Sequence, residues 1–372
     1  MRKNVLLLLL LICLKGFAQY PNPFYPDAVE MILHDTQNIY VAKYDSIIAI
    51  DKQSGRKTLI YKRPRLTERY AHDGLTTMSL HEGRLWLGTN DGVIMDYYKG
   101  CLTRHEYEGN PTPFSESPIS GIAFDSQDRM VVGFYNQVGW IDGNTVTGAS
   151  EIPSLATEEY IHTMVMDDTD TLWVACTGFY PAGCFSYYTI EKGVSLILEG
   201  YDTLPFCGSG PARGLVIDSH RNKWFCVENK LVCFDGKSFK AYELGDGHAW
   251  GSGIDVALDN NGTIWVAEWN GQLTRFSESG EWTLFSCGIE TKRWFCIDID
   301  GDDIYIGTDH GVLKFHNGVY SELDLTTTSM PNSCVLAPDD DQSHSYDLQG
   351  RRLNGEPGKG LYIQNGRKVM VK

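Results

Sequence analysis

His248 and Glu268 are two residues whose side chains could do chemistry together in this sequence. An imidazole and a carboxylate on neighbouring loops can act as a general base and as a ligand for a divalent cation such as Mg²⁺. A second glutamate, Glu228, stands 40 residues earlier in a similar stretch, so a glutamate at this place is also expected from repetition alone. Two interpretations stay open: no catalytic residue, or catalysis by His248 and Glu268 with Mg²⁺.

A larger group of residues has the chemistry of a binding site. Aromatic rings stack on the apolar faces of sugars or on peptide side chains, while neighbouring charged and amide groups select hydroxyls or charges. Polar residues are also common in loops that bind nothing. A glycan or an envelope protein is the partner that this chemistry favours. The residues expected to bind it are Arg69, Tyr70, Tyr160, Arg213, Glu228, Trp250, Trp269, Asn270, Trp294 and His310.

Motifs for metals, nucleotides and known nucleophiles are missing from the sequence. It contains no Cys-x-x-Cys pair, no His-Glu-x-x-His, no Gly-x-Ser-x-Gly and no Walker sequence. The spacing of these motifs is what places ligands or a nucleophile in reach of one another. We therefore expect no metal and no cofactor, apart from Mg²⁺ in the catalytic alternative.

The elements that must position these residues are short strands in a repeat. The stretch "DNNGTIWVAEWNGQLTRF", residues 259–276, has counterparts along the chain. Their equivalent positions are spaced by 40 to 51 residues, which is the period of a four-stranded propeller blade. These positions are Tyr40, Trp86, Val131, Trp173, Trp224, Trp265 and Tyr305. A recurring aromatic at one place in every unit is typical of core packing, so these residues are not expected to bind ligand.

Each unit divides into four strands, A to D. An apolar strand A ends in a polar turn, strand B carries the recurring aromatic, and strands C and D follow after Gly- and Asn-containing turns. One unit cannot bury its own faces, whereas seven around an axis can. We predict an all-β fold, a seven-bladed β-propeller of four-stranded blades over residues 19–325. In such a ring the D-to-A and B-to-C loops meet on one face, where we expect the ligand.

The repeats resemble the two-component regulator propeller repeat. Asp259, Gly262, Trp265 and Phe276 match its pattern, as do equivalent residues of the second and seventh units. In that family such repeats often form exported sensor parts, so the resemblance implies a sensor-like role. The stretch "IWVAE" around Glu268 also resembles a strand of the virginiamycin B lyase family, which implies a His/Glu pair with magnesium.

Composition and charge limit the classes of partner that we expect. The chain has 372 residues, 42% of them hydrophobic, and a formal net charge of −16. An acidic surface repels phosphate backbones, so nucleic acid is excluded as an expected partner. The N-terminal apolar run of ten residues is too short to span a bilayer, and no other segment is apolar enough to cross a membrane. We expect a monomer.

Both ends of the chain carry targeting-like segments. Residues 1–18 contain Arg2 and Lys3, an apolar run and then a small residue, Ala18, which predicts a cleaved signal peptide. The protein is therefore expected to be secreted, periplasmic or at the cell surface. Residues 326–345 are expected to be a linker. Residues 346–372 form a short β-rich tail that resembles type IX secretion sorting tails, and a β extension packed on the propeller is the alternative.

Nine cysteines remain after the expected cleavage. Cys226 and Cys233 flank a hairpin turn, as do Cys176 and Cys184, so cross-strand disulfides are conceivable. An odd number of cysteines and the absence of a dense framework favour buried free thiols, which behave as small apolar side chains.

Overall fold

The computed structural model describes most of the propeller and parts of the tail. The described residues are 27–43, 45–62, 74–105, 107, 117–134, 137–152, 160–177, 185–198, 212–227, 229–244, 253–277, 280–287, 293–327, 335–336, 345–346, 360–364 and 367–371.

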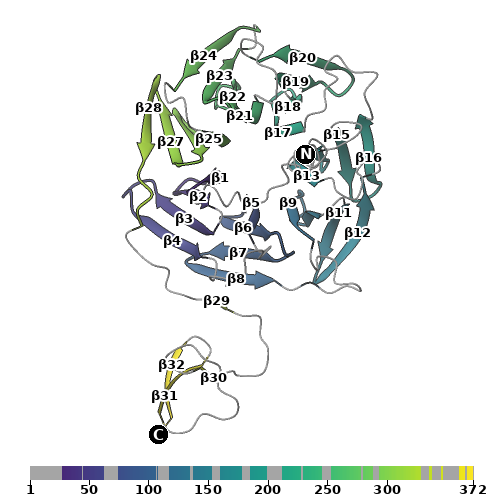
Figure 1. Ribbon diagram of the computed structural model, residues 1–372. Coiled ribbons are helices and arrows are strands. Elements are labelled where there is room, and N and C mark those ends of the chain that lie inside the picture. The colour runs from purple at the N-terminus through teal and green to yellow at the C-terminus, as the bar shows by residue number, and fades with distance from the viewer. Residues whose placement is uncertain are drawn as a thin grey trace, which may run out of the picture.

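Twenty-eight strands form seven antiparallel sheets of four around a central axis, which confirms the predicted β-propeller (Figure 1). The innermost strands are β1 (Val29–His34), β5 (Leu75–His81), β9 (Ile119–Phe124), β13 (Tyr160–Met166), β17 (Ala212–Ile217), β21 (Gly253–Leu258) and β25 (Trp294–Asp300). The second strands are β2 (Asn38–Lys43), β6 (Arg84–Thr89), β10 (Met130–Phe134), β14 (Leu172–Thr177), β18 (Lys223–Val227), β22 (Ile264–Glu268) and β26 (Asp303–Thr308).

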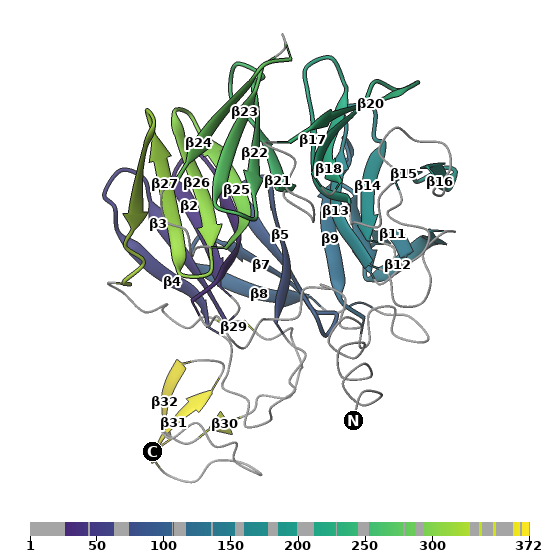
Figure 2. The same cartoon turned by 45° about the horizontal axis from the view of Figure 1, so that its top comes forward.

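The two outer layers complete each blade. The third strands are β3 (Ser46–Asp51), β7 (Ile94–Tyr98), β11 (Gln137–Asp142), β15 (Phe185–Thr189), β19 (Lys230–Phe234), β23 (Gln272–Phe276) and β27 (Gly311–His316). The outermost strands are β4 (Lys57–Lys62), β8 (Cys101–His105), β12 (Thr145–Glu151), β16 (Gly193–Leu198), β20 (Phe239–Glu243), β24 (Trp282–Ser286) and β28 (Val319–Leu323). The blades twist, so that β5 stands upright in Figure 2 while β8 of the same blade lies across it.

The recurring aromatic of the second strand is a core residue, as its spacing predicted. Trp173, Trp224 and Trp265 are each less than a tenth exposed. In the same three blades the indole Nε1 donates a hydrogen bond to an aspartate in the turn between the first two strands, as Trp265 does to Asp259 Oδ2 at 3.1 Å. The other carboxylate oxygen of Asp259 accepts the backbone N–H groups of the turn. One aspartate therefore fixes both the turn and the aromatic ring.

The chain enters each innermost strand from one face of the ring. That face, with the D-to-A and B-to-C connections, is called the loop face below, and the opposite one, with the turns between first and second strands, the turn face. Near its loop-face end every innermost strand contains an extra residue that interrupts its ladder with the second strand. These residues are Glu30, Thr76, Ser120, His162, Gly214, Ile254 and Phe295.

Among the described residues, no strand is exchanged between blades to close the ring, because the four strands of each blade come from one continuous stretch. Closure rests on close packing of β1 against β25 and β26. An added Cβ at Gly307 would lie 2.4 Å from the Val29 carbonyl oxygen, so the two blades touch through backbone here. On the turn face His34 Nδ1 lies 2.7 Å from Asp298 Oδ2 across the same seam.

Similar contacts join the turns of other neighbouring blades on the turn face. They are His81 with Asp128, Ser126 with Asp170, and Arg221 with Asp168. Together with the buried faces between blades, these contacts hold adjacent units in one ring.

The segment after the seventh blade passes outside the first. Asp324 forms an ion pair with Lys57 of β4 at 3.0 Å, and β29 (Val335–Leu336) then pairs in parallel with β8 of the second blade. The tail forms a three-stranded antiparallel sheet of β30 (Ser345–Tyr346), β31 (Gly360–Gln364) and β32 (Arg367–Val371), which lies apart from the ring in Figures 1 and 2. The linker is thus interrupted by a short strand that the sequence did not predict.

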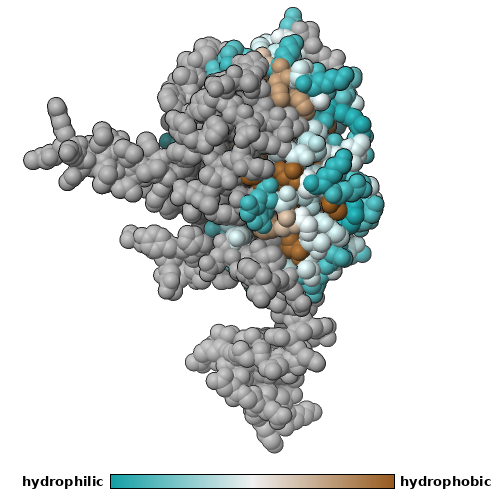
Figure 3. All heavy atoms as spheres, turned by 90° about the vertical axis from the view of Figure 1, so that its right-hand side faces the viewer, coloured by the Kyte–Doolittle hydropathy of each residue, from teal (hydrophilic) through white to brown (hydrophobic). Residues whose placement is uncertain are grey.

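The six described cysteines are free thiols, as expected. Cys226 pairs with Leu231 and Cys233 pairs with Trp224, so the two thiols are not opposite each other on the hairpin. No described residue belongs to a helix that could cross a membrane. Among the described residues that face the viewer in Figure 3, polar ones predominate, with a few separate apolar patches.

Candidate functional site on the loop face

A glutamate and a tryptophan follow one another at the loop-face end of β22, where the turn to β23 begins. Glu268 ends β22, and its carbonyl accepts a hydrogen bond from the N–H of Gly271 at 3.1 Å, which tightens the turn. Trp269 is partly exposed and Asn270 is exposed at the tip. The Nδ2 group of Asn270 donates to Gln272 Oε1 at 3.3 Å.

The Glu268 side chain points inward. It is 1% exposed, and its Oε1 accepts a hydrogen bond from the hydroxyl of Thr274, which is fully buried. The carboxylate is therefore held in the blade rather than presented at the surface, unlike the neighbouring Trp269.

Trp269 contacts two residues of the seventh blade. The Arg293 guanidinium carbon lies 5.4 Å from its ring centroid, within cation–π range, and the Phe295 ring meets it edge-on at 5.9 Å. Arg293 itself is exposed. An aromatic surface and a cation thus come together where the sixth and seventh blades meet.

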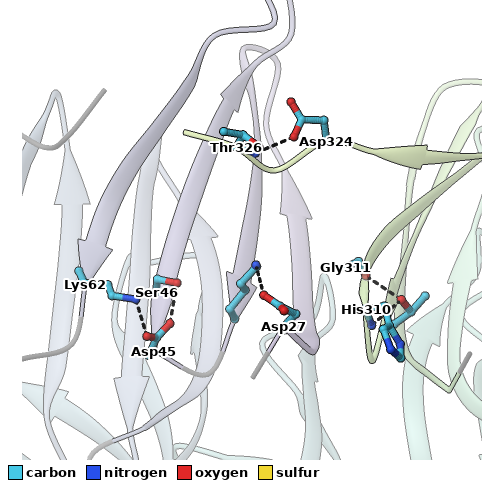
Figure 4. A network of polar contacts seen from close by, with 10 residues as sticks. Asp27, Asp45, Ser46, Lys62, His310, Gly311, Asp324 and Thr326 are labelled. Carbon is cyan, nitrogen blue, oxygen red and sulfur yellow. Dashed lines mark hydrogen bonds and ion pairs between the residues drawn. The ribbon is translucent and has the colours of Figure 1, made fainter. Parts of the chain in front are cut away.

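The turn between β26 and β27 extends this surface. Arg293 and Asp309 are joined by two backbone-anchored hydrogen bonds, one to the Asp309 carboxylate at 3.1 Å. Asp309 is buried, and its Oδ1 lies 2.9 Å from Nδ1 of the exposed His310. Thr308 Oγ1 donates to the Gly311 carbonyl at 3.0 Å and closes the turn beside His310 (Figure 4). We call this surface of Trp269, Asn270, Arg293, Phe295, Asp309 and His310 the blade 6–7 rim.

The first blade contributes paired charges to the loop face. Asp27 and Lys43 form an ion pair at 3.1 Å, and Asp45 pairs with Lys62 (Figure 4). The two lysines described in this part of the face, Lys43 and Lys62, thus each have a carboxylate partner.

Arg213 does not lie in the kind of element that the sequence predicted. The sequence suggested a loop, but Arg213 is the second residue of β17, on the wall of the central channel at its loop-face end. It lies opposite Cys226 in β18, and burial lowers the pKa of its guanidinium. No hydrogen bond or ion pair joins this guanidinium to another described residue.

Trp294 is not accessible, which corrects the expectation that its ring lines the loop face. It begins β25 and is 0% exposed, packed among apolar residues between the sixth and seventh blades. Pairing with Thr308 fixes its direction, because strand side chains alternate and this one falls on the side facing the neighbouring blade. Its indole Nε1 is buried without a hydrogen-bond partner in the described structure.

The structure does not describe the side chains of the remaining residues that the sequence predicted for the site. Arg69, Tyr70, Glu228, His248 and Trp250 lie outside the described residues, and of Tyr160 only its place at the start of β13 is described. The structure therefore unites Trp269, Asn270 and His310 on one rim, places Arg213 on the channel wall, and leaves the catalytic pair of His248 and Glu268 untested.

Two carboxyl groups of the innermost strands were missed by sequence reasoning. Burial raises the pKa of Glu30 in β1 to about 7. Burial also raises the pKa of Asp255 in β21 to about 7, although Asp255 accepts backbone hydrogen bonds from Val256 and from Ile297 of the next blade. The available signal was an acidic residue inside an otherwise apolar strand, as in "VEMIL" and "GIDVAL".

Among the described residues, one group of three potential metal ligands gathers within 4.8 Å: His81, Glu82 and Asp128. It lies on the turn face, at the opposite end of the blades from Glu268. Within the described part of the chain, no comparable group surrounds Glu268, so the Mg²⁺ of the catalytic alternative would need ligands from elsewhere.

The fold is shared with several solved propellers. Virginiamycin B lyase from Staphylococcus aureus is 14% identical with a TM-score of 0.64, over 78% of this chain and 94% of that one. The extracellular domain of a putative one-component system from B. thetaiotaomicron is 16% identical with a TM-score of 0.57, over 91% of this chain and 43% of that one. The WD40 propeller domain of Doa1 is 12% identical with a TM-score of 0.58, over 82% and 96%.

The similarity is one of fold. At these identities a propeller that is an enzyme, one that belongs to a signalling protein and a WD40 domain all superimpose on this chain, so the fold does not choose among their roles. No family model and no curated protein matches the sequence.

Proposed function

We propose that the protein is an exported, non-catalytic binding or sensor-like propeller that recognises a glycan or a protein partner on its loop face. The observation that carries this proposal is the blade 6–7 rim. There the partly exposed ring of Trp269 lies beside Arg293, while His310 stands exposed on buried Asp309. An aromatic surface bordered by fixed polar groups is the usual composition of a sugar or peptide site.

Two further observations support an exported, sensor-like role. Residues 1–18 have the pattern of a signal peptide. A solved structure of similar fold is the extracellular domain of a putative one-component system, and a related one belongs to a putative hybrid two-component system. The role of the tail in type IX secretion is part of the same proposal.

Intrinsic tryptophan fluorescence tests the binding role. The full chain is titrated with a panel of oligosaccharides, and Trp269→Ala is compared with Trp282→Ala, which alters a ring on the outermost strand β24. We expect a saturable change that is lost in the first variant and kept in the second. If no sugar changes the signal, capture of envelope proteins by the same two variants decides whether the rim docks a protein.

A metal-dependent lyase or hydrolase is the second candidate, favoured by the fold similarity to virginiamycin B lyase and by a glutamate at the loop-face end of β22. In this case His248 and Glu268 would act with Mg²⁺. Turnover that requires Mg²⁺ and disappears in Glu268→Gln, with unchanged thermal stability, would support the enzyme. Binding without turnover would support the recognition role.

A further inference from the structure

The closure seam, where the first and seventh blades meet, joins two blades that share no strand among the described residues. His34 is the last residue of β1, at the turn-face end of this seam. Because side chains alternate along a strand, His34 lies on the same side of β1 as Ile32. Ile32 packs with Cys296 and Tyr305 of the seventh blade in one buried cluster. The imidazole of His34 therefore faces the seventh blade.

Each nitrogen of the His34 ring faces a carboxylate of β25. Nδ1 lies 2.7 Å from Asp298 Oδ2, and Nε2 lies 3.7 Å from Asp300 Oδ1. A neutral imidazole has one N–H and one lone pair, so it can donate to only one of these carboxylates and turns its lone pair towards the other. The imidazolium donates from both nitrogens and attracts both carboxylates. The arrangement therefore favours the protonated ring.

Lys52 completes a group of four charged side chains across the seam. Its Nζ lies 2.6 Å from Asp300 Oδ2, and it belongs to the first blade, as His34 does. With His34 protonated, two cations of the first blade meet two carboxylates of the seventh. With His34 neutral, the group has one excess negative charge, and its four side chains are each less than a third exposed, so water screens this charge only in part. Burial raises the pKa of the neighbouring Tyr305 phenol and Cys296 thiol, so both stay neutral.

The other titratable groups around this seam act elsewhere. Asp303 pairs with Lys314 and His316 inside the seventh blade. Asp35 accepts the backbone N–H groups of its own turn. Glu30, whose pKa burial raises to about 7, lies at the opposite, loop-face end of β1. His34 is therefore the described histidine whose protonation acts directly across the closure seam.

We propose that His34 is a pH-sensitive clasp of the ring: its protonated imidazole holds two carboxylates of the seventh blade, and its deprotonation loosens the closure seam. The hydrogen bond to Asp298 outweighs burial and holds the pKa of His34 above its ordinary value. A histidine whose pKa is raised on folding stabilises the fold fully below its unfolded pKa of about 6.5, and this contribution is lost as the pH rises through the folded pKa. Closure is therefore tighter in a mildly acidic medium than in an alkaline one.

Hydrogen exchange of the full chain at pH 5.5 and pH 8, corrected for the intrinsic pH dependence of amide exchange, tests the clasp. Between these pH values, the protection of β1 and β25 should fall about fivefold more in the wild type than in His34→Gln, whose side chain is neutral throughout. Strands β13 and β14 of the fourth blade, opposite the seam, should not distinguish the two proteins. His316→Gln removes a histidine–carboxylate contact inside one blade and should behave like the wild type. Glu30 is present in all three proteins, so its own titration cancels.

The titration of the His34 ring in the wild type, followed by NMR of histidine-labelled protein, does not depend on the folding of a variant. We expect a midpoint above about 6.5, which Asp298→Asn lowers. A midpoint at or below this value overturns the clasp. So does an equal fall of β1 and β25 protection in the wild type and in His34→Gln, or a difference between them that is the same in every blade.

Discussion

Glu30 allows the burial of the innermost strands to be tested by its response to pH. It is the extra residue in the ladder of β1, and burial raises the pKa of its carboxyl from 4.5 to about 7. A carboxyl whose pKa is raised on folding stabilises the fold below its unfolded pKa, and this stability is lost as the pH rises through the folded pKa. Glu30→Gln replaces the carboxyl by a neutral group of similar shape and removes this dependence.

The magnitude follows from the size of the shift. One pKa unit corresponds to about 1.4 kcal/mol. Once the pH exceeds 7, the shift of Glu30 therefore lowers the free energy of unfolding by about 3 kcal/mol relative to low pH. Relative to the wild type, the stability of Glu30→Gln should therefore rise by about 3 kcal/mol between pH 4.5 and pH 8. Any cost of burying the amide itself does not depend on pH and cancels in this comparison.

Urea unfolding followed by fluorescence at pH 4.5 and pH 8 measures the effect. Glu191→Gln, an exposed carboxylate in the turn between β15 and β16, is the matched control and should show no such gain. If Glu30→Gln and the wild type differ by the same free energy at both pH values, the Glu30 carboxyl is solvated and the account of the channel wall given above is wrong.

Three more predictions concern packing and turns. Burial alone would raise the pKa of Asp259, but hydrogen bonds from Trp265 and the turn amides outweigh it and hold this pKa below its usual value. Asp259→Asn should therefore lower the free energy of unfolding in urea by about 1–3 kcal/mol at pH 7. The difference from the wild type should vanish as the pH falls through the folded pKa. Gly307→Ala should cost about 3 kcal/mol or more and lower the melting temperature, because its Cβ would collide with the backbone of the first blade at the closure seam. Cys226 should resist thiol reagents in the native protein while partly exposed Cys101 reacts, as peptide mapping after brief alkylation would show.

The repeat made the fold predictable from sequence. Seven aromatic or β-branched positions at a regular period define seven blades, because each unit must bury its faces against the next. The aspartate before three of the anchors, such as Asp259 before Trp265, can likewise be predicted from the sequence, since both its turn and its hydrogen bond to the indole are local.

The candidate site was less predictable, and Trp294 and Arg213 show why. Both stand at the boundary between a loop and an innermost strand, and a displacement of one residue in a strand reverses the side to which a side chain points. Trp294 therefore turned out to be buried between blades, whereas Trp269, inside a turn, was placed correctly.

By itself, the sequence determined the seven-bladed ring, its loop face and the polar and aromatic character of that face, because these depend on local periodicity. Only the tertiary structure decided which carboxyl groups of the innermost strands are desolvated. Asp255 accepts the N–H of Ile297 across a gap of about 40 residues in the chain, so the desolvation of its carboxyl arises only when neighbouring blades pack together. The desolvated carboxyl groups of the innermost strands are thus a property of the assembled ring, whereas the blades are a property of the repeat.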